Sequence, residues 1–453
     1  MKKKKRWRLS TTHIILLSFL SAILLGSLLL ALPISARDGQ AISYIDALFT
    51  ATTATCVTGL VTLPTVSTWS LFGQVVILLL IQIGGLGVIT VMAGLMVAVH
   101  RKMGLRDSRL IGDAFNLNSL SGLSGFIKKV IIGTFLVEGV GALLYMTVFI
   151  PEFGGRGIWI SVFNSVSAFC NAGIDIIAED SLVGYSTHPL VNTVTSLLVI
   201  LGGLGYIVWW DLLRVVREIP AQGLKCFRRL TLHSKLTLTA TAILLMGGGV
   251  VIFVLEYNNP LTIGELSLFD KIQVSLFQSV TTRTAGFATV PQENLTNATA
   301  LFCLLLMFIG GSPAGTAGGV KTVTVAVLLA TALSTIRNRD EVTLFGRRLS
   351  KQVTRKAVAV TGMSFVILSL STILLAAVTD ASAMDILYET VSATATVGLT
   401  RALTPLLTTV GKIIIILTMY AGRIGPISLA VAFASKKEIV NNIKDPTEEV
   451  VVG

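Results

Sequence analysis

Long apolar runs alternate along the chain with short stretches rich in serine, threonine and alanine. The runs Leu71–Val99 and Val191–Trp210 contain no charged residue, and each is at least as long as the roughly 20 helical residues that cross the hydrocarbon core of a bilayer. The short stretches hold only ten to fifteen residues. Because a helix of that length cannot cross the core, we expect these stretches to enter the membrane and turn back. The pattern predicts an all-α integral membrane protein.

The short stretches form a fourfold internal repeat. Each ends at a glycine that a leucine, isoleucine or phenylalanine follows, and the four glycines are 114, 113 and 112 residues apart. A fixed period over this length indicates repeated architecture. The four stretches are Phe49–Gly59, Phe163–Gly173, Leu276–Gly286 and Tyr388–Gly398.

The sequence around each glycine follows one order. An apolar helix and an acidic connection precede it, and a second apolar helix with a glycine cluster of its own follows. We therefore predict four M1–P–M2 repeats (first helix, pore helix, second helix), with eight transmembrane helices and four re-entrant pore helices around a pseudo-fourfold pore. The expected repeats are residues 12–100, 124–213, 233–338 and 354–435, with cytoplasmic termini at 1–11 and 436–453.

The turns that end at these glycines are candidates for a cation-selective filter. At membrane depth their backbone carbonyls lack helical partners and must face protein or a water-filled path. Four such turns around one axis would form rings of carbonyl oxygens, as in a potassium filter, and glycine supplies the positive φ that the turn needs. Close helix packing also favours small residues, but it does not explain four stretches in register. The expected potassium-binding residues are Val57, Thr58, Gly59, Asn171, Ala172, Gly173, Thr284, Ala285, Gly286, Thr396, Val397 and Gly398.

The second helix of the third repeat is interrupted by a run with low helix propensity. It lies about halfway through its hydrophobic stretch, so we interpret it as a gate below the filter rather than a packing kink. The run consists of Gly310, Gly311, Ser312, Pro313, Ala314, Gly315, Thr316, Ala317, Gly318 and Gly319.

Three charged residues fall within the apolar segments. Arg423 has three open interpretations: it holds the gate shut by hydrogen bonds to loop carbonyls, it is a fixed barrier to cations, or it pairs with an acid. A charge at mid-bilayer costs about 2.5–3.5 kcal/mol and is usually functional or paired. We expect Arg283 to reach the outer mouth or brace its turn. For Glu138 we favour a hydrogen bond to a serine or threonine over coupling to a proton or sodium ion.

Composition and charge support a transport protein rather than an enzyme. Hydrophobic residues make up 53% and charged residues 13% of the chain, and the mean hydropathy is +0.80. The four cysteines and four histidines show no metal-ligand or catalytic spacing, so we expect no enzyme activity and no covalent cofactor. Carboxylates gather in the connections expected outside, where they would concentrate cations.

The basic residues lie in five clusters that hold 28 of the 36 lysines and arginines. The positive-inside rule places all five clusters on the cytoplasmic face, so the net charge of +12 requires no nucleic-acid partner. The clusters are Lys2–Arg8, Arg101–Lys129, Arg214–Lys235, Arg337–Lys356 and Lys436–Lys444.

These motifs together resemble the Trk/Ktr/HKT superfamily of cation transporters, and within it the KtrB membrane subunits of bacterial Ktr potassium uptake systems. The resemblance covers about Leu9 to Ser435. It is carried by the four glycine turns and by the segments Gln82–Gly87, Thr282–Phe287 and Gly422–Pro426. The family's filter glycines map onto Gly59, Gly173, Gly286 and Gly398, its gating loop onto 310–319, and its pore-facing arginine onto Arg423. Pro313 departs from the small polar residue expected in that loop.

The resemblance implies potassium uptake across the bacterial inner membrane. It also implies a homodimer, surrounded by membrane lipid, on a cytosolic KtrA-like ring of RCK fold. ATP or ADP on that ring, not on this chain, would regulate the gate, and sodium would promote uptake. The alternative is a secondary transporter that couples sodium or proton entry to another solute. That alternative predicts inverted repeats and a mid-membrane carboxylate, whereas the sequence offers four repeats of one orientation and only Glu138.

Overall fold

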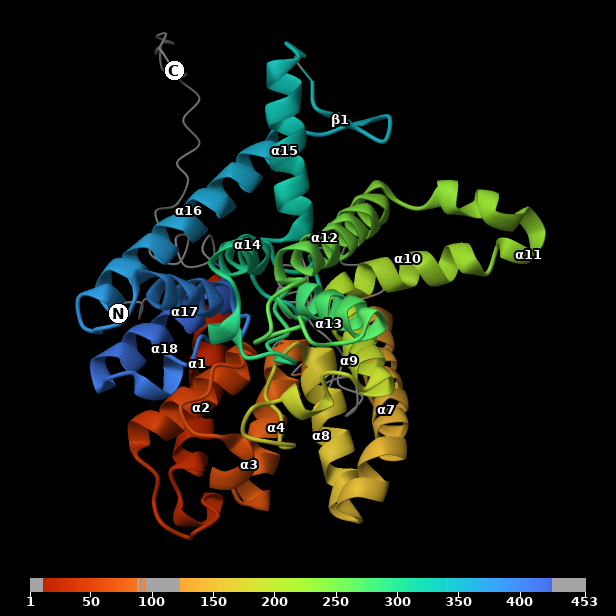
Figure 1. The fold of residues 1–453 in the computed structure, drawn as a ribbon. Helices are drawn as coiled ribbons and strands as arrows, with labels where there is room; N and C mark the ends of the chain where they lie inside the picture. The colour runs from red at the N-terminus through yellow and green to blue at the C-terminus, as the bar shows by residue number, and fades with distance from the viewer. Residues whose placement is uncertain (1–10, 88–89, 92, 94–122, 340, 426–453) are drawn as a thin grey trace, which may run out of the picture.

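The computed structural model describes residues 11–87, 90, 91, 93, 123–339 and 341–425. Helices dominate this part of the chain, and a two-stranded hairpin joins two of them (Figure 1). The α-helices are α1 (Thr11–Leu30), α2 (Tyr44–Cys56), α3 (Thr65–Thr68), α4 (Leu71–Leu86), α7 (Leu123–Phe153), α8 (Arg156–Cys170), α9 (Pro189–Leu204), α10 (Tyr206–Val216), α11 (Ile219–Gln222), α12 (Leu232–Glu256), α13 (Leu268–Thr281), α14 (Asn297–Phe308), α15 (Thr322–Ile336), α16 (Lys351–Ala376), α17 (Ala383–Ala395) and α18 (Thr409–Ile424). The 3₁₀ turns are η1 (Pro33–Ser35), η2 (Val183–Tyr185), η3 (Gly223–Arg229), η4 (Gln292–Asn294) and η5 (Thr404–Leu406), and the strands are β1 (Thr343–Leu344) and β2 (Arg347–Arg348).

Four helices of the described chain are long and apolar enough to cross a membrane, namely α1, α7, α12 and α16. Each opens one of the four repeats. The pair α9 and α10 also passes the length test, but the two helices meet at an angle of 99°. Large apolar side chains such as Leu143, Ile243 and Phe365 are exposed on the long helices, as expected for surfaces that face lipid. The chain is an all-α membrane protein.

The four short helices α2, α8, α13 and α17 match the predicted re-entrant pore helices in length. Each packs against the first helix of its own repeat, and most of its side chains are buried. Ser267 and Ser382 cap α13 and α17 by accepting hydrogen bonds from the backbone of Asp270 and Asp385. Carboxylates in the first turn favour a helix N-terminus.

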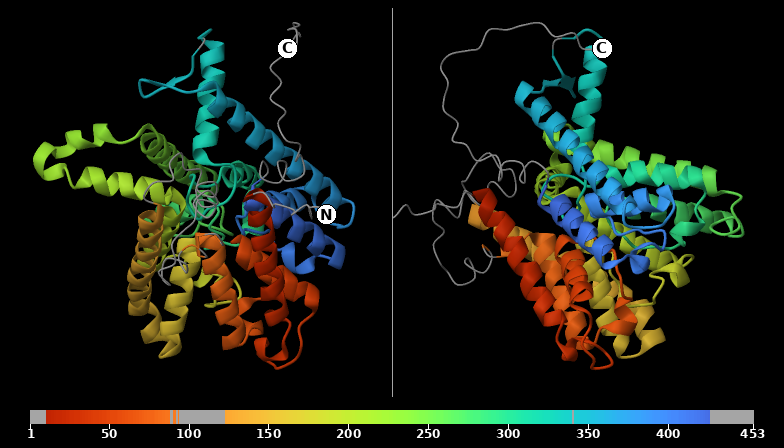
Figure 2. Two further views of the ribbon diagram at one scale, coloured as in Figure 1. Left: turned by 180° about the vertical axis from the view of Figure 1, so that it is seen from behind. Right: turned by 90° about the vertical axis from the view of Figure 1, so that its left-hand side faces the viewer.

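The repeats follow one another around a common centre in chain order. The second helix of each repeat contacts the pore helix of the next, through the pairs α4–α8, α9–α13 and α14–α17, and α18 returns to α2. Figures 1 and 2 show the repeats arranged in this way. The last repeat therefore closes on the first, which places the four glycine turns together.

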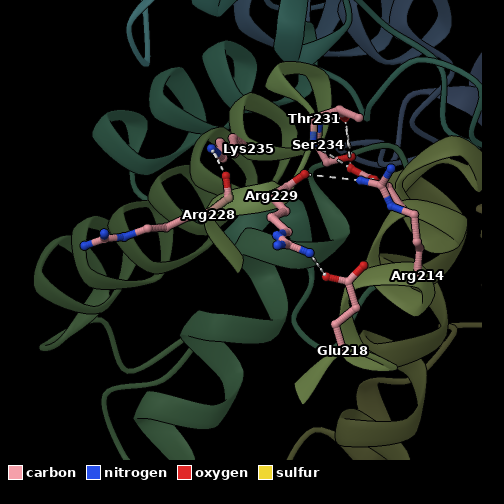
Figure 3. A network of polar contacts seen from close by, with 8 residues as sticks. Arg214, Glu218, Arg228, Arg229, Thr231, Ser234 and Lys235 are labelled. Carbon is pink, nitrogen blue, oxygen red and sulfur yellow. Dashed lines mark hydrogen bonds and ion pairs between the residues drawn. The ribbon is translucent and has the colours of Figure 1, made fainter. Parts of the chain in front are cut away.

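A polar network ties α10 to the segment that precedes α12 (Figure 3). Asp211 binds Arg214 at 2.7 Å and accepts two hydrogen bonds of 2.9 Å from Thr231, and Arg229 pairs with Glu218 at 2.8 Å. These contacts lie within the basic cluster Arg214–Lys235. The predicted cytoplasmic termini, the cluster Lys436–Lys444 and most of Arg101–Lys129 fall outside the described residues.

Candidate functional site

Each pore helix leads into a turn with left-handed backbone at two positions. One is the glycine itself, and the other lies two residues before it, where positive φ is uncommon for a non-glycine residue. The same short motif therefore follows all four pore helices. The φ angles are 55°, 60°, 67° and 51° at Val57, Asn171, Thr284 and Thr396, and 100°, 63°, 85° and 99° at Gly59, Gly173, Gly286 and Gly398.

The four glycines form a closed ring. A methyl group added to any one of them would collide with the carbonyl oxygen of the residue that precedes the next glycine in the chain. At Gly59 the methyl would lie 2.6 Å from the Ala172 oxygen, and at Gly286 it would lie 2.6 Å from the Val397 oxygen. Gly398 meets the Thr58 oxygen in the same way, so the ring returns to its start. The carbonyl oxygens of Thr58, Ala172, Ala285 and Val397 lie around this ring.

Hydroxyl groups of the pore helices hold the turns in place. Thr53 and Ser392 accept hydrogen bonds of 3.0 Å from the backbone N–H of Gly59 and Gly398. Ser167 accepts one of 3.1 Å from Ile174. These three hydroxyls stand six residues before their glycines, and alignment of the four stretches would have revealed this position. They explain part of the serine and threonine enrichment that the sequence showed.

Glycines of the second helices let those helices approach the ends of the pore helices. A methyl group at Gly84, Gly202 or Gly422 would overlap a pore-helix carbonyl oxygen four residues before a ring glycine. These oxygens belong to Thr55, Phe169 and Thr394. In the third repeat, Gly310 instead lies against Gly318 of the interrupting loop.

The segment 310–319 forms an irregular loop between α14 and α15, as the sequence predicted. Its backbone binds the break between α9 and α10, through Ser312 N–H to the Gly203 carbonyl at 2.9 Å and Tyr206 N–H to the Ala314 carbonyl at 3.0 Å. The loop is largely buried. The Pro313 carbonyl lies against Gly205, so the proline faces the break in the second repeat.

The loop also touches the turns directly. The Thr316 hydroxyl lies 2.8 Å from Asn171 Oδ1 and 3.0 Å from the Phe169 carbonyl oxygen, so these two acceptors share its single proton. Gly318 N–H donates to Thr284 Oγ1 at 3.2 Å. These contacts could not be predicted from the sequence, because a loop of small residues carries no signal for its partners.

Arg423 binds two carbonyl groups that belong to different repeats. Its Nη1 donates to the Thr316 carbonyl at 2.6 Å, and its Nη2 donates to the Gly84 carbonyl at 2.5 Å. None of the salt bridges among the described residues includes Arg423. Of the three interpretations, pairing with an acid is therefore not found in the described chain, while a hydrogen bond to the loop is present.

For Arg283 the structure contradicts only one of the two expectations, the reach to the outer mouth, and for Glu138 it contradicts the favoured partner. Arg283 does not reach the outer mouth but is buried, and its Nη2 donates to the Gly310 carbonyl at 3.2 Å. The carboxylate of Glu138 accepts from the Gln82 amide at 3.3 Å rather than from a serine or threonine, while Ser165 donates to the Glu138 backbone carbonyl. The expected partner of Glu138 was wrong because the amide comes from another repeat, 56 residues away.

Carboxylates at the other ends of the pore helices are braced by cations and hydroxyls. Asp46 pairs with Lys412 at 2.6 Å, and Asp385 pairs with Arg401 at 2.8 Å. Glu389, which is fully buried in α17, accepts hydrogen bonds of 2.6 Å from Thr400 and Thr404. Partial burial would raise the pKa of Asp385, but hydrogen bonds from Ser382 and Arg401, together with the charge of Arg401, hold it below its usual value.

Comparison with known proteins agrees with this architecture. The model of the family described as "TrkH: Cation transport protein" matches residues 3–443. The Ktr system potassium uptake protein B of Bacillus subtilis (strain 168) is 38% identical over 450 residues, which cover 99% of this chain and 98% of the relative. The potassium/sodium uptake protein NtpJ of Enterococcus hirae is 37% identical over 462 residues, with 100% and 99% covered. The crystal structure of the potassium transporter TrkH from Vibrio parahaemolyticus is similar in fold, with a TM-score of 0.72 and 16% identity over 96% of this chain and 87% of that one.

Proposed function

Since this chain belongs to the TrkH family of cation transport proteins, we propose that it takes up potassium through the ring of four glycine turns. The observation that carries the proposal is the closure of that ring, in which the carbonyl oxygens of Thr58, Ala172, Ala285 and Val397 surround one centre. Carbonyl oxygens can replace the hydration shell of potassium. The expected filter consists of the three residues that end at each ring glycine, Val57–Gly59, Asn171–Gly173, Thr284–Gly286 and Thr396–Gly398.

Electrostatics of the pore helices support a cation as the transported ion. The C-terminal ends of α2, α8 and α17 come directly before the turns, and a helix C-terminus carries the negative end of the helix dipole. A membrane potential supplies about 2.3 kcal/mol per charge for each 100 mV, which corresponds to roughly fiftyfold accumulation of a monovalent cation without chemical energy.

The loop 310–319 is the proposed gate, with Arg423 as the residue that holds it closed. Hydrogen bonds of this loop to Asn171, Thr284 and Gly202 support the proposal, because these residues belong to the turns or to the second helix beside them. Potassium that leaves the filter would meet this loop next, so uptake requires the loop to move.

Regulation and assembly follow from the family. We propose a homodimer in the bacterial inner membrane with cytoplasmic termini, on a KtrA-like ring of RCK subunits that binds ATP or ADP. We also propose that sodium promotes uptake. Three relatives are named as members of Ktr systems, and a fourth is named a potassium/sodium uptake protein.

Flux into liposomes tests the proposed function. Liposomes that contain the purified chain should take up potassium under an applied voltage, with sodium as a weaker competitor. Removal of 312–318 should raise this flux, and the variant Gly286→Ser should lose preference for potassium over sodium because its side chain would meet the Val397 carbonyl at 2.6 Å. Flux that requires a sodium or proton gradient and another solute would support the secondary transporter instead. Unchanged selectivity in Gly286→Ser would remove this turn from the filter.

A further inference from the structure

The inner ends of the four turns carry side chains that the carbonyl filter does not use. These side chains stand at the left-handed position two residues before each ring glycine, and all four are buried. Three of them offer a neutral oxygen atom, while the one from the first repeat is apolar. They are Val57, Asn171, Thr284 and Thr396.

The loop covers all three oxygen-bearing side chains. Thr316 donates its hydroxyl to Asn171 Oδ1 at 2.8 Å, and Gly318 donates its N–H to Thr284 Oγ1 at 3.2 Å. Gly318 also lies against Thr396, because a methyl group added to this glycine would overlap Thr396 Oγ1. That hydroxyl is buried and has no hydrogen-bond partner. Residues 316 and 318 therefore occupy the place toward which these oxygens present their lone pairs.

Withdrawal of the loop would remove the partners of Asn171 Oδ1 and Thr284 Oγ1, so that all three oxygens would then lack one. A buried polar group that loses its partner costs about 1–3 kcal/mol, so another group must take the place of the loop. Neutral oxygens from several chain segments are the ligands by which proteins dehydrate potassium. All three oxygens could coordinate one potassium ion at once. The loop donates one O–H and one N–H, so it satisfies only two of them.

The apolar member of the set has a separate explanation. Val57 lies against Gly84, since a methyl group there would come 2.9 Å from Val57 Cγ2. The Gly84 carbonyl is the group that binds Arg423. The first repeat therefore faces the Arg423 guanidinium rather than the loop. Because the loop does not bind here, no side-chain oxygen is needed at position 57.

We propose that a second potassium site, made of the side-chain oxygens of Asn171, Thr284 and Thr396, forms at the inner end of the filter when the loop withdraws. In the closed state, Thr316 and Gly318 fill this site in place of the ion. Potassium and the loop therefore compete for the same oxygens, and an ion at the inner end keeps the gate from closing. The inference rests on the proposed function and extends it to a coupling between ion occupancy and gating.

Barium block of the full-length chain in liposomes tests the site, because Ba²⁺ has nearly the size of potassium but binds its ligands more strongly. Thr316→Val removes the loop hydroxyl at constant volume and should raise basal potassium flux about tenfold, the effect of one or two net hydrogen bonds. Thr316→Ser keeps the hydroxyl and should leave the flux near that of the wild type. The open background Thr316→Val then serves for the measurement of barium block.

In that background, Thr284→Val and Thr396→Val each remove one site oxygen and should raise the barium concentration for half-block about tenfold. Thr284→Ser should restore block, and Val57→Thr, which adds a fourth oxygen, should strengthen it. Thr289→Val is the matched control, because Thr289 is also buried with an unpartnered hydroxyl but lies beyond the turn. Its barium block should not change.

The outcomes separate this inference from the proposed function. Voltage-driven potassium flux with the same barium block in Thr284→Val and Thr396→Val as in their background would overturn the inner site alone. Equal flux in Thr316→Val and the wild type would overturn the part that assigns loop closure to this hydroxyl. Absence of potassium flux from every variant, the loop deletion included, would overturn the proposed function and the inner site with it.

Discussion

Replacement of Arg423 by lysine separates the two interpretations of this residue that the structure leaves standing. The guanidinium spans two carbonyl groups, of Thr316 at 2.6 Å and of Gly84 at 2.5 Å. A lysine keeps the positive charge but has a single nitrogen, so we expect it to retain one of these bonds. A hydrogen bond to a charged group contributes about 1.5–3 kcal/mol. Loss of one bond should therefore increase the open fraction of the loop roughly ten- to hundredfold, as long as the closed state dominates.

The assay is voltage-driven potassium flux into liposomes with Arg423→Lys, Arg423→Gln and the wild type at equal protein density. If Arg423 holds the loop, both variants should conduct faster than the wild type, since neither can bridge the two carbonyls. If Arg423 is only a fixed positive barrier, Arg423→Lys should conduct as slowly as the wild type and Arg423→Gln alone should be fast. That second pattern would refute the assignment of Arg423 to the gate. Arg214→Lys, on the exposed surface of α10, is the control for replacing an arginine by a lysine and should not change the flux.

Two further predictions concern stability, with thermal unfolding of the purified protein in detergent as the measurement. Gly422→Ala should lower the free energy of unfolding by about 1–3 kcal/mol, because the added methyl overlaps the Thr394 carbonyl. In the control Gly362→Ala the added methyl meets no atom within 4 Å, so this variant should unfold like the wild type. Equal unfolding of the two variants would contradict the close approach of α18 to the end of α17. Because the pKa of Asp385 is lowered in the folded protein, its ionised form stabilises the fold above the unfolded pKa of about 3.9. Stability should therefore hold from pH 8 to pH 5 and fall as the pH drops below about 4, and this fall should be smaller in Asp385→Asn.

The sequence sufficed for the features that depend on periodicity and on residue type. The spacing of Gly59, Gly173, Gly286 and Gly398 predicted the four turns, because every turn needs the same backbone conformation at the same place. The low helix propensity of 310–319 predicted the break between α14 and α15. The turn motif and the composition of the loop are each local, and the period is read along the chain, so no knowledge of contacting residues was required.

The partners of the charged and polar side chains could not be predicted in the same way. Thr316 and Asn171 are 145 residues apart, and Arg423 and Gly84 are 339 residues apart. A charge within an apolar segment shows that a partner is needed but does not show which one. The acceptors of Arg423 and Arg283 are backbone carbonyls, which every residue carries, so no residue type marks their positions. Only the closure of the four repeats into a ring brings donor and acceptor together.

The difference between the third repeat and the others shows how the proposed fourfold filter could have a gate that is not fourfold. In three repeats the second helix sits on a pore-helix carbonyl through a glycine, at Gly84, Gly202 and Gly422. The third repeat lacks this contact, and its second helix, α14, ends at Phe308. The loop 310–319 that follows this helix contacts the turns of the second and third repeats and the Arg423 guanidinium of the fourth. Selectivity needs four equivalent turns because the ion is surrounded on all sides, whereas closure needs only one segment to occupy the centre. A substitution in the loop can therefore change the gate while the four turns keep their mutual contacts.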